Sequence, residues 1–356
     1  MQIKKVLFLT GKLQHYRIPI FNLIVKNYNI NLTVAHSGEK MNDGSFLFIE
    51  LILKERKIGP IIIHDNSLFN LCNSYDVVVA MFYLQRISFM KLVFIKDRKF
   101  KIIYWGIGVK ASQKSKFDQP TILNYFRYYI ANKSDAMIFY SNYAKEKYIS
   151  KGVINNKLFV MNNTVSISSV IKNQIQKHNI IFVGTLNKSK KIFRLLSNYR
   201  NTCEKYKNYP MLEIVGNGKE FVKVQKWISK NSIDEKIILH GSVFNEIELE
   251  IIFNRALVCI SPGQAGLSVL KSFGYGVPFI TSNDAITGGE RLNIENGING
   301  VLLNSRYDLK KVLVDIYFNP EKYIKMGNNA KKFYYDHRTP EQMAQGFIDA
   351  INYVFN

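Results

Sequence analysis

Residues Ser261 to Pro278 carry the most specific chemical signal in this 356-residue sequence. They read SPGQAGLSVLKSFGYGVP after a short apolar run, which predicts a strand, a glycine-edged turn and a helix that begins near Ala265. Gly266 lets the backbone approach a ligand closely, while Leu267 and Ser268 present amides and a hydroxyl. The first amides of a helix have no partner inside it, so they attract anions. The segment therefore predicts a site for a ligand that carries phosphate.

Glycines also end three earlier apolar runs. Gly184 precedes Thr185, Gly216 and Gly218 flank an asparagine, and Gly241 follows a histidine. Ligands of parallel α/β sheets lie outside the carboxyl ends of the strands, so these loops are expected at one edge of the same site. Ordinary tight turns are the alternative for each glycine pair.

The elements that would position these loops form two series of short buried runs. Longer amphipathic stretches separate most of the runs, which predicts parallel sheets covered by helices on both faces, a doubly wound α/β architecture. The expected strands are Ile3 to Leu9, Ile30 to Ala35, Ile61 to His64, Val77 to Met81, Ile102 to Trp105 and Ala136 to Tyr140, then Ile180 to Gly184, Leu212 to Gly216, Ile237 to Gly241, Leu257 to Ser261, Pro278 to Ser282 and Gly300 to Leu303.

The two series predict two Rossmann-like domains. The first is expected over residues 1–165, a polar linker over 166–178 and the second domain over 179–335. After Asn319 the pattern becomes wholly helical, and Pro340 opens a last helix within residues 336–356.

The ordered motifs resemble those of family 4 glycosyltransferases, retaining enzymes with the two-domain GT-B fold. The likeness covers nearly all of the chain and follows Phe182-Val-Gly-Thr-Leu186 with Lys190, then Ile214 to Gly218, His240-Gly241, the opening segment and Gly297-Ile-Asn-Gly300. It implies that the two domains face a cleft, with the acceptor on the first and the nucleotide sugar on the second. It also implies that the C-terminal helix returns to the first domain.

The resemblance further implies site residues on the donor side. Lys190 would place an ammonium near the donor diphosphate, although the family's usual arginine after the glycine is replaced by Thr185. The family's two glutamates, eight positions apart, are replaced by Gly263 and Lys271, so Glu290 is the expected substitute acid. Two alternatives stay open, a solvated helix start for the lysine cluster and a glutamate that satisfies its own backbone amides. The expected donor-binding residues are Gly184, Thr185, Gly216, Gly218, Gly241, Pro262, Gly266, Leu267, Ser268 and Lys271, with Lys190 and Glu290 as catalytic residues.

On the acceptor side, residues 10–19 join the first strand to the first helix. Gly11 would permit close approach, His15 and Arg17 would meet acceptor hydroxyls or phosphate, and Trp105 would stack on a sugar. A plain helix start is the alternative for this loop. Ile107 stands where related sequences often have a histidine, and similar retaining enzymes let the leaving phosphate take the acceptor proton.

These features predict a metal-independent hexosyltransferase that uses a nucleotide sugar and a surface polysaccharide or lipid-linked oligosaccharide acceptor. The resemblance implies that the nucleotide is uridine-linked. The sequence contains no Asp-x-Asp triplet, and no metal or other cofactor is expected. The missing glutamates leave open a weakened homologue that only binds a nucleotide sugar or glycan.

Composition bears on partners. The net charge of +22 favours phosphates and anionic surfaces, and Lys91 to Lys116 is strongly basic beside the aromatic run Tyr125 to Tyr129. An anionic membrane surface is therefore an expected partner, with a solvated basic surface as the alternative. No nucleic-acid-reading motif is present. The apolar runs are too short for a membrane span, so a cytoplasmic protein is expected, with attachment to the inner face of the cell membrane left open. The three cysteines are widely spaced, which predicts free thiols.

Overall fold

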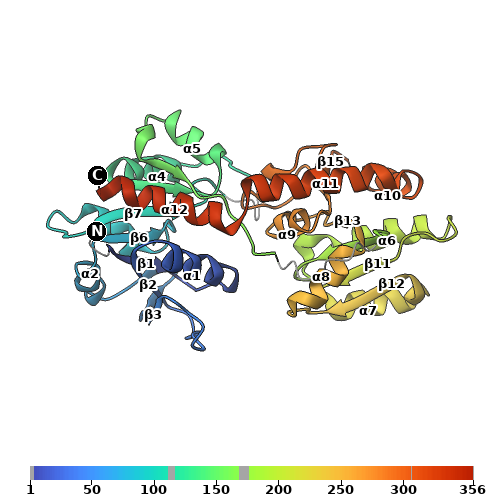
Figure 1. Ribbon diagram of the computed structural model, residues 1–356, viewed down its shortest axis with the longest axis horizontal. Coiled ribbons are helices and arrows are strands. Elements are labelled where there is room, and N and C mark those ends of the chain that lie inside the picture. The colour runs from blue at the N-terminus through green and yellow to red at the C-terminus, as the bar shows by residue number, and fades with distance from the viewer. Residues whose placement is uncertain (1–3, 111–116, 168–175, 306, 356) are drawn as a thin grey trace. The chain divides into compact units, whose positions relative to one another are not determined.

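The computed structural model describes residues 4–110, 117–167, 176–305 and 307–355 and divides into two compact units (Figure 1). The first unit runs from the N-terminus to Lys110, from Gln119 to Val165 and from Thr339 to the C-terminus. The second unit comprises Ala111–Asp118 and Ser166–Arg338. Each unit is built around its own parallel sheet.

The first unit holds a seven-stranded, all-parallel sheet in the order β3-β2-β1-β6-β7-β8-β9. Its strands are β1 (Lys4–Thr10), β2 (Ile30–His36), β3 (Ile49–Ile52), β6 (Val77–Met81), β7 (Lys101–Gly106), β8 (Ala136–Phe139) and β9 (Leu158–Val160). One predicted strand is wrong in its placement. β5 (Ile61–Ile63) pairs with β4 (Arg56–Ile58) in a separate antiparallel ribbon, whereas β3 and β9 in the main sheet were not predicted.

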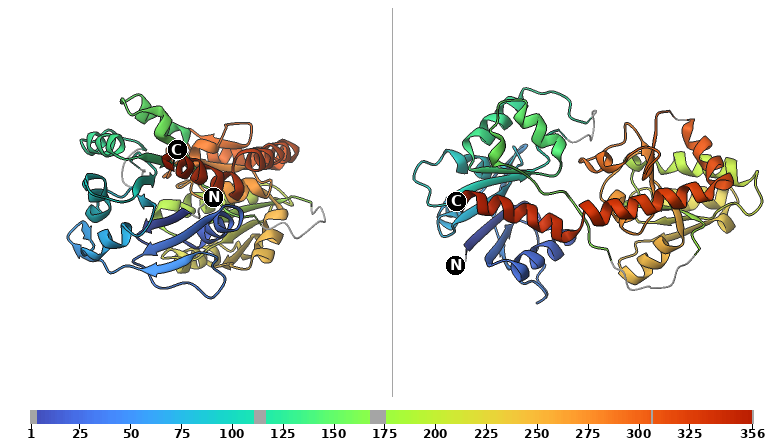
Figure 2. Two further views of the ribbon diagram at one scale, coloured as in Figure 1. Left: turned by 60° about the vertical axis from the view of Figure 1, so that its left-hand side comes forward. Right: turned by 45° about the horizontal axis from the view of Figure 1, so that its top comes forward.

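Helices of the first unit cover this sheet, and the C-terminal helix is one of them. The helices are α1 (Ile18–Asn27), α2 (Ser67–Cys72), α3 (Ile87–Lys91), α4 (Leu123–Lys133), α5 (Asn142–Ile149) and α12 (Pro340–Phe355). Phe347 and Ile351 of α12 are buried in one core with Phe8 and Trp105. α12 lies beside this sheet in Figures 1 and 2, and Lys4 Nζ donates to Asn352 Oδ1 at 3.0 Å. The predicted return of the last helix is confirmed.

The second unit holds a six-stranded, all-parallel sheet in the order β12-β11-β10-β13-β14-β15. Its strands are β10 (Asn179–Val183), β11 (Leu212–Val215), β12 (Ile237–Gly241), β13 (Ala256–Ile260), β14 (Phe279–Ser282) and β15 (Gly300–Leu303). Its helices are α6 (Ile192–Cys203), α7 (Phe221–Lys230), α8 (Glu246–Asn254), α9 (Ser268–Gly274), α10 (Asp308–Phe318) and α11 (Pro320–His337). The predicted doubly wound α/β architecture is confirmed.

Strand order reverses once in each sheet. In the first unit the chain winds outward from β1 to β3 and then resumes at β6 on the other side of β1. In the second unit it winds from β10 to β12 and resumes at β13. The loops that leave the two central strands therefore separate at these points, and such crevices are where open α/β sheets bind ligands. The fold thus directs attention to the loops after β1 and β6 and after β10 and β13.

The expected linker at 166–178 lies largely outside the described residues. Its last part is tied to the second unit, since Lys177 Nζ donates to the carbonyls of Phe253, Ala256 and Tyr275 at 3.3 Å each. The roles expected for the two domains, acceptor binding and donor binding, stay predictions.

Candidate active site

The loops after β10 and β11 pack against each other through glycine. The amide of Gly184 donates to the carbonyl of Val215, and that of Leu186 to Asn217. Gly216 has a φ of 140°, and a Cβ there would overlap the carbonyl oxygen of Gly184. The two strand ends therefore meet backbone to backbone, which leaves no side chain between them. This is the close approach that the glycine pattern predicts, made here by one loop to another.

The loop after β13 closes on the same place. The amide of Gly263 donates to the carbonyl of Lys190 at 3.2 Å, and its own carbonyl accepts from Ile286 at 2.9 Å. A Cβ on Gly263 would overlap the carbonyl oxygen of Ser189. The backbone of the lysine loop thus fills the space that a glutamate at position 263 would need. The glutamate that the family carries at this position would not fit into this packing.

Lys190 lies at the centre of this junction. It ends a 3₁₀ turn (Lys188–Lys190) that Asn187 caps, because the Asn187 side chain accepts from the Lys190 amide. The lysine is 6% exposed, and its Nζ lies 3.0 Å from the point that a Cβ of Gly184 would occupy. Within the described residues its ammonium has no hydrogen-bond or ion-pair partner. Burial lowers the pKa of Lys190, and the charges of Cys259 and Glu290 oppose that shift only in part.

Glu290 is close enough to Lys190 to act on its charge, and its carboxylate also accepts hydrogen bonds from residues just before it in the chain. It begins a 3₁₀ turn (Glu290–Asn293), and Oε2 accepts from the Gly288 amide at 3.0 Å and the Thr287 hydroxyl at 3.3 Å. The alternative of a glutamate that satisfies its own backbone is therefore observed. The negative charge of the same carboxylate also opposes the lowering of the pKa of Lys190 by burial. Glu290 therefore both accepts these local hydrogen bonds and acts electrostatically on Lys190.

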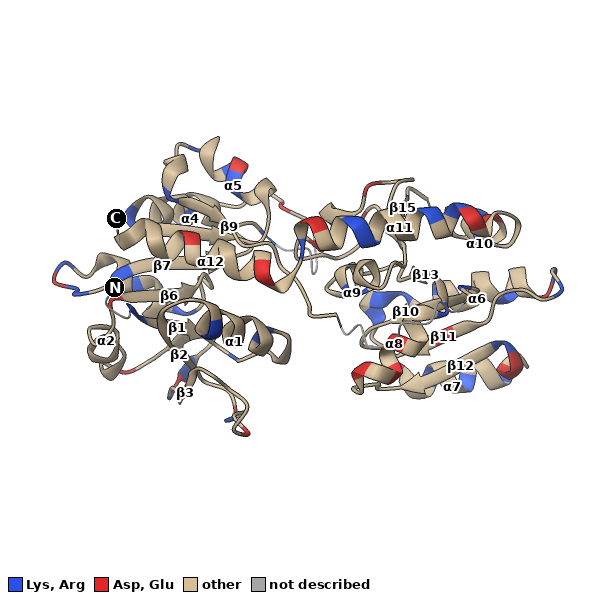
Figure 3. Ribbon diagram, in the orientation of Figure 1, with Lys and Arg blue, Asp and Glu red and all other residues tan. Residues whose placement is uncertain are grey.

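Lys271 does not present a free ammonium to a ligand. Its Nζ forms an ion pair with Glu246 Oε2 at 2.7 Å and donates to the carbonyl of Ser166 at 3.3 Å. Glu246 begins α8, whose acidic residues are visible in Figure 3. The expectation that Lys271 binds the donor stays a prediction, and its ammonium already has these two partners. A carboxylate absent from position 271 is supplied beside it by Glu246, a residue that the sequence pattern did not single out because the pair is 25 positions apart.

The remaining donor-side residues lie on short loops. α9 begins at Ser268 rather than near Ala265, so the turn before it is longer than predicted. The space in front of Gly266 is open, and the hydroxyl of Ser268 has no hydrogen-bond partner within the described residues. The side chain of Thr185 is exposed and Pro262 is buried. Gly241 is the last residue of β12, whereas β11 ends at Val215 and Gly218 lies in the loop that follows.

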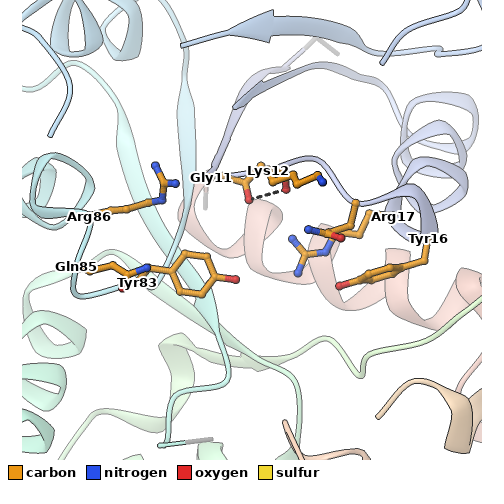
Figure 4. Close-up of a pocket in the computed structure, with 9 residues that line it drawn as sticks. Gly11, Lys12, Tyr16, Arg17, Tyr83, Gln85 and Arg86 are labelled. Carbon is orange, nitrogen blue, oxygen red and sulfur yellow. Dashed lines mark hydrogen bonds between the residues drawn. The ribbon is translucent and has the colours of Figure 1, made fainter. Parts of the chain in front are cut away.

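In the first unit, the corresponding crevice is a pocket of about 290 Å³ (Figure 4). It lies where the loops after β1 and β6 separate. Its lining residues are Thr10, Gly11, Lys12, Gln14, Tyr16 and Arg17 from the first loop and Tyr83, Gln85 and Arg86 from the second. The second loop was not predicted to take part, because nothing in its short sequence marks it.

The predicted acceptor residues are only partly brought together. Gly11 and Arg17 line the pocket, whereas His15 is exposed and does not. Gly11 permits a close approach by Arg86, whose guanidinium would overlap a Cβ on the glycine. Trp105 is fully buried, so the prediction that it stacks on a sugar is wrong. Its ring instead lies under the guanidinium of Arg17, with 4.7 Å from Cζ to the ring centroid.

A buried acid also ties together strands of the second unit. Glu213 of β11 is fully buried and accepts from Asn179 Nδ2 at 2.6 Å, His240 Nε2 at 2.7 Å and Arg255 Nε at 2.7 Å and Nη2 at 2.5 Å. Burial would raise the pKa of Glu213, but these donors outweigh it and lower the pKa. The network joins β10, β11 and β12, and it orients the histidine that precedes Gly241.

Comparison with known proteins identifies the class of enzyme. The family model "Glycosyl transferases group 1" matches residues 167–333. The chain is similar to a 41.2 kDa protein in the cps region of Klebsiella pneumoniae, 27% identical over 298 residues, which is 78% of this chain and 75% of the relative. It is 26% identical over 167 residues to the lipopolysaccharide 1,6-galactosyltransferase of Salmonella typhimurium, or 44% of this chain and 45% of that one. The chain is a glycosyltransferase.

Solved structures place this glycosyltransferase in the GT-B fold. The complex of Anabaena HepE with UDP and glucose superimposes with a TM-score of 0.71 at 12% identity and covers 98% of this chain and 99% of that one. The matched family segment falls within the second unit, which holds Lys190 and the loop around Gly263. Within the described ranges, no three or more His, Cys, Asp or Glu side chains gather as a metal site would require, and no helix is long and apolar enough to cross a membrane.

Proposed function

We propose that this glycosyltransferase is a retaining enzyme of family 4 that moves a hexose or N-acetylhexosamine from a uridine-linked nucleotide sugar. The observation that carries the proposal is Lys190, a buried residue whose ammonium lies beside Gly184 with no hydrogen-bond or ion-pair partner among the described residues, where the strand order of the second unit reverses. Departure of a nucleoside diphosphate leaves negative charge on its phosphates. A fixed cation in such a loop stabilises that charge. The UDP and glucose bound by HepE support this class of donor.

The chemistry needs no nucleophile from the protein. The bond between C1 of the sugar and the diphosphate oxygen breaks, and an acceptor hydroxyl bonds to C1 on the same face. The hydroxyl proton passes to the leaving diphosphate. The protein then contributes positioning and charge stabilisation. Lys190 stabilises the charge of the diphosphate, and the loop from Gly266 to Ser268 binds the phosphate attached to the sugar. Glu246, beside Lys271, is suited to accept hydrogen bonds from the ribose hydroxyls.

We propose that the reaction is independent of divalent metal. Glycosyltransferases of the other main fold hold a divalent metal with paired carboxylates, and this sequence has no Asp-x-Asp triplet. Lys190 provides the positive charge in its place. We assign the donor to the second unit and the acceptor to the first.

For the acceptor, we propose a surface polysaccharide or a lipid-linked oligosaccharide. The similar proteins from a cps region and from lipopolysaccharide synthesis support it. A donor screen tests the proposal. The full chain is incubated with a panel of nucleotide sugars, and released nucleoside diphosphate and the anomeric configuration of the product are measured. One uridine-linked donor turned over with retention is expected. Binding of nucleotide without turnover of any donor would instead support a subunit that only binds.

Glu290 provides a first test of the donor site. Glu290→Gln keeps an oxygen for the Gly288 amide but removes the charge. If the carboxylate accepts a sugar or ribose hydroxyl, kcat/KM for the donor should fall about 10- to 100-fold, the worth of one hydrogen bond to a charged group. Steady-state kinetics and the melting temperature are measured together. A lower melting temperature with unchanged kinetics would mean that Glu290 only stabilises the turn that it begins and does not contact the donor.

An exposed apolar face on the first unit supports attachment to a membrane. At the start of α4, Ile122 and Tyr125 are 84% and 77% exposed, and Leu123, Phe126 and Tyr129 are exposed as well. The ring of Tyr129 stacks on Phe94 at 6.0 Å, which brings the exposed Lys96 and Lys99 near this helix. Lys114 and Lys116 of the predicted basic segment lie outside the described residues. We propose that this aromatic and basic face binds anionic lipid, on the inner side of the cell membrane.

Charge reversal tests the membrane proposal. Lys96→Glu with Lys99→Glu should weaken sedimentation with anionic vesicles at least about tenfold, because each cation near such a surface contributes about 1 kcal/mol. Arg98 is left intact because it forms an ion pair with Asp135 at 3.1 Å. Lys226→Glu with Lys230→Glu on α7 changes the net charge equally and is the matched control. Equal sedimentation of both double variants would contradict the assignment of this face.

A further inference from the structure

Arg17 carries a buried positive charge that no acidic side chain balances. The residue is 5% exposed, and its guanidinium donates to the hydroxyl of Tyr140 and to Met81 Sδ at 3.5 Å. Its flat face lies on Trp105. Within the described residues it forms no ion pair, and its Nε is buried without a hydrogen-bond partner. Buried charges in proteins are usually paired, so this one is exceptional.

Keeping an unpaired charge at this buried position is costly. A buried cation is expensive to remove from water, and apolar residues of similar volume often stabilise a fold by comparison. Burial opposes the charge on Arg17, but the phenol groups of Tyr140 and Tyr16 outweigh it and raise the pKa. The guanidinium is therefore charged at every working pH. An uncompensated cation of this kind is suited to an anionic ligand.

The surroundings of Arg17 form a small site for such a ligand. Figure 4 shows the guanidinium and the Tyr83 side chain directed toward each other, with Tyr16 on the same side. Arg86 lies opposite, but its Nη1 is neutralised by Glu55 at 2.7 Å. Lys12 and Arg17 thus remain as unbalanced cations in the lining, and no lining residue is acidic. Two cations with phenol donors match the charge and the hydrogen-bond acceptors of a phosphate better than those of a neutral sugar.

We propose that this pocket binds a phosphate or diphosphate group of the acceptor, so that the enzyme recognises a phosphorylated acceptor by its anionic end. The role of that group in transfer rests on the proposed function, whereas its binding does not. Arg17 supplies the fixed charge, the hydroxyls of Tyr16 and Tyr83 donate to phosphate oxygens, and the exposed Lys12 closes over the group.

Calorimetric titration of the full chain with pyrophosphate, in the presence of saturating UDP, tests the site. UDP occupies the proposed donor site, so remaining heat reports the pocket of the first unit. One site is expected in the wild type, and Arg17→Gln should weaken it at least about tenfold, the loss of one charge-assisted contact. Tyr83→Phe should weaken it by a smaller factor. Lys188→Gln, which removes an exposed lysine of the second unit, is the matched control and should leave the titration unchanged.

Stability provides a second readout if Arg17→Gln binds nothing. Because the variant removes an unbalanced buried charge, its melting temperature without ligand should equal or exceed that of the wild type. Pyrophosphate should raise the melting temperature of the wild type but not that of the variant. No pyrophosphate binding by a wild type that binds UDP would overturn the proposal. Equal binding by wild type, Arg17→Gln and Tyr83→Phe would overturn it as well.

Two further probes distinguish a lipid-linked phosphate from the phosphate of a soluble sugar. Farnesyl diphosphate and glucose 1-phosphate are titrated in the same way as pyrophosphate. Tighter binding of farnesyl diphosphate would identify a lipid-linked acceptor, and tighter binding of glucose 1-phosphate a soluble phosphorylated sugar. Transfer activity is measured independently with the donor panel. Failure of transfer together with Arg17-dependent pyrophosphate binding would therefore count against the proposed function and not against this site.

Discussion

Lys190→Ala is expected to lower kcat/KM for the donor by about 10²- to 10³-fold, the loss typical for one preorganised group that stabilises transition-state charge. Lys190 is buried beside Gly184, and its ammonium has no hydrogen-bond or ion-pair partner among the described residues, so a donor diphosphate would be its first direct partner. The loop backbone is held by the Asn187 cap and by Gly263, not by the lysine side chain. The variant should therefore fold, and its loss of activity should exceed any loss of stability.

Lys188→Ala is the matched control for this prediction. Lys188 begins the same turn but is exposed, and a surface charge contributes little because water and salt screen it. Its removal should change kcat/KM less than about tenfold. Similar losses in the two variants would mean that the cluster acts as a diffuse positive surface. Lys190→Arg should recover only part of the activity, because a planar guanidinium does not fit the space of a compact ammonium.

The pH profile gives the same residue a second signature. Burial lowers the pKa of Lys190, so its charge is present at low pH and is lost at a lower pH than that of an ordinary lysine. kcat/KM, which reports the free enzyme, should decline on the alkaline side through this lowered pKa. In Lys190→Arg the decline should move to higher pH, because arginine stays protonated.

The sequence was sufficient to predict the fold where strands are buried on both faces. β1, β6 and β10 each contain a continuous apolar run of four or five residues, and the sequence predicts all three strands correctly. β3 was missed because its residues are half exposed at a sheet edge, and β5 was assigned to the wrong sheet. A short apolar run indicates a strand, but it does not say which partner the strand will pair with.

The candidate site shows a similar limit. Glycine positions predicted which loops meet, because glycine marks close backbone contact. The sequence also showed that position 263 lacks an acid, while only the structure shows that Ser189 leaves no space there for a side chain. Trp105 is an aromatic residue of the kind that stacks on sugars, but α12, more than two hundred positions away, packs in the same core and helps to bury its side chain. Pairs such as Lys271 with Glu246 depend on the tertiary fold and leave no local pattern.

Glu213→Ala is expected to have the largest effect on stability, about 3–5 kcal/mol, because removing one partner of a buried ion pair leaves the other charge uncompensated. The carboxylate accepts four hydrogen bonds from Asn179, His240 and Arg255 across three strands. Without it, three sets of donors in the sheet lose their acceptor. Chemical denaturation of the full chain, followed in the second unit by the fluorescence of Trp227, measures the change.

The control and the pH dependence make this prediction specific. Glu204→Ala removes a half-exposed glutamate that pairs with Arg200 on α6, and such surface pairs contribute at most about 1 kcal/mol. The pKa of Glu213 is lowered in the folded protein, so its contribution is present above the pKa of the unfolded chain and is lost as pH falls through the folded value. The stability gap between the wild type and Glu213→Gln should accordingly narrow in acid. A gap that stays constant with pH would show that shape, and not charge, is what position 213 contributes to the junction of β10, β11 and β12.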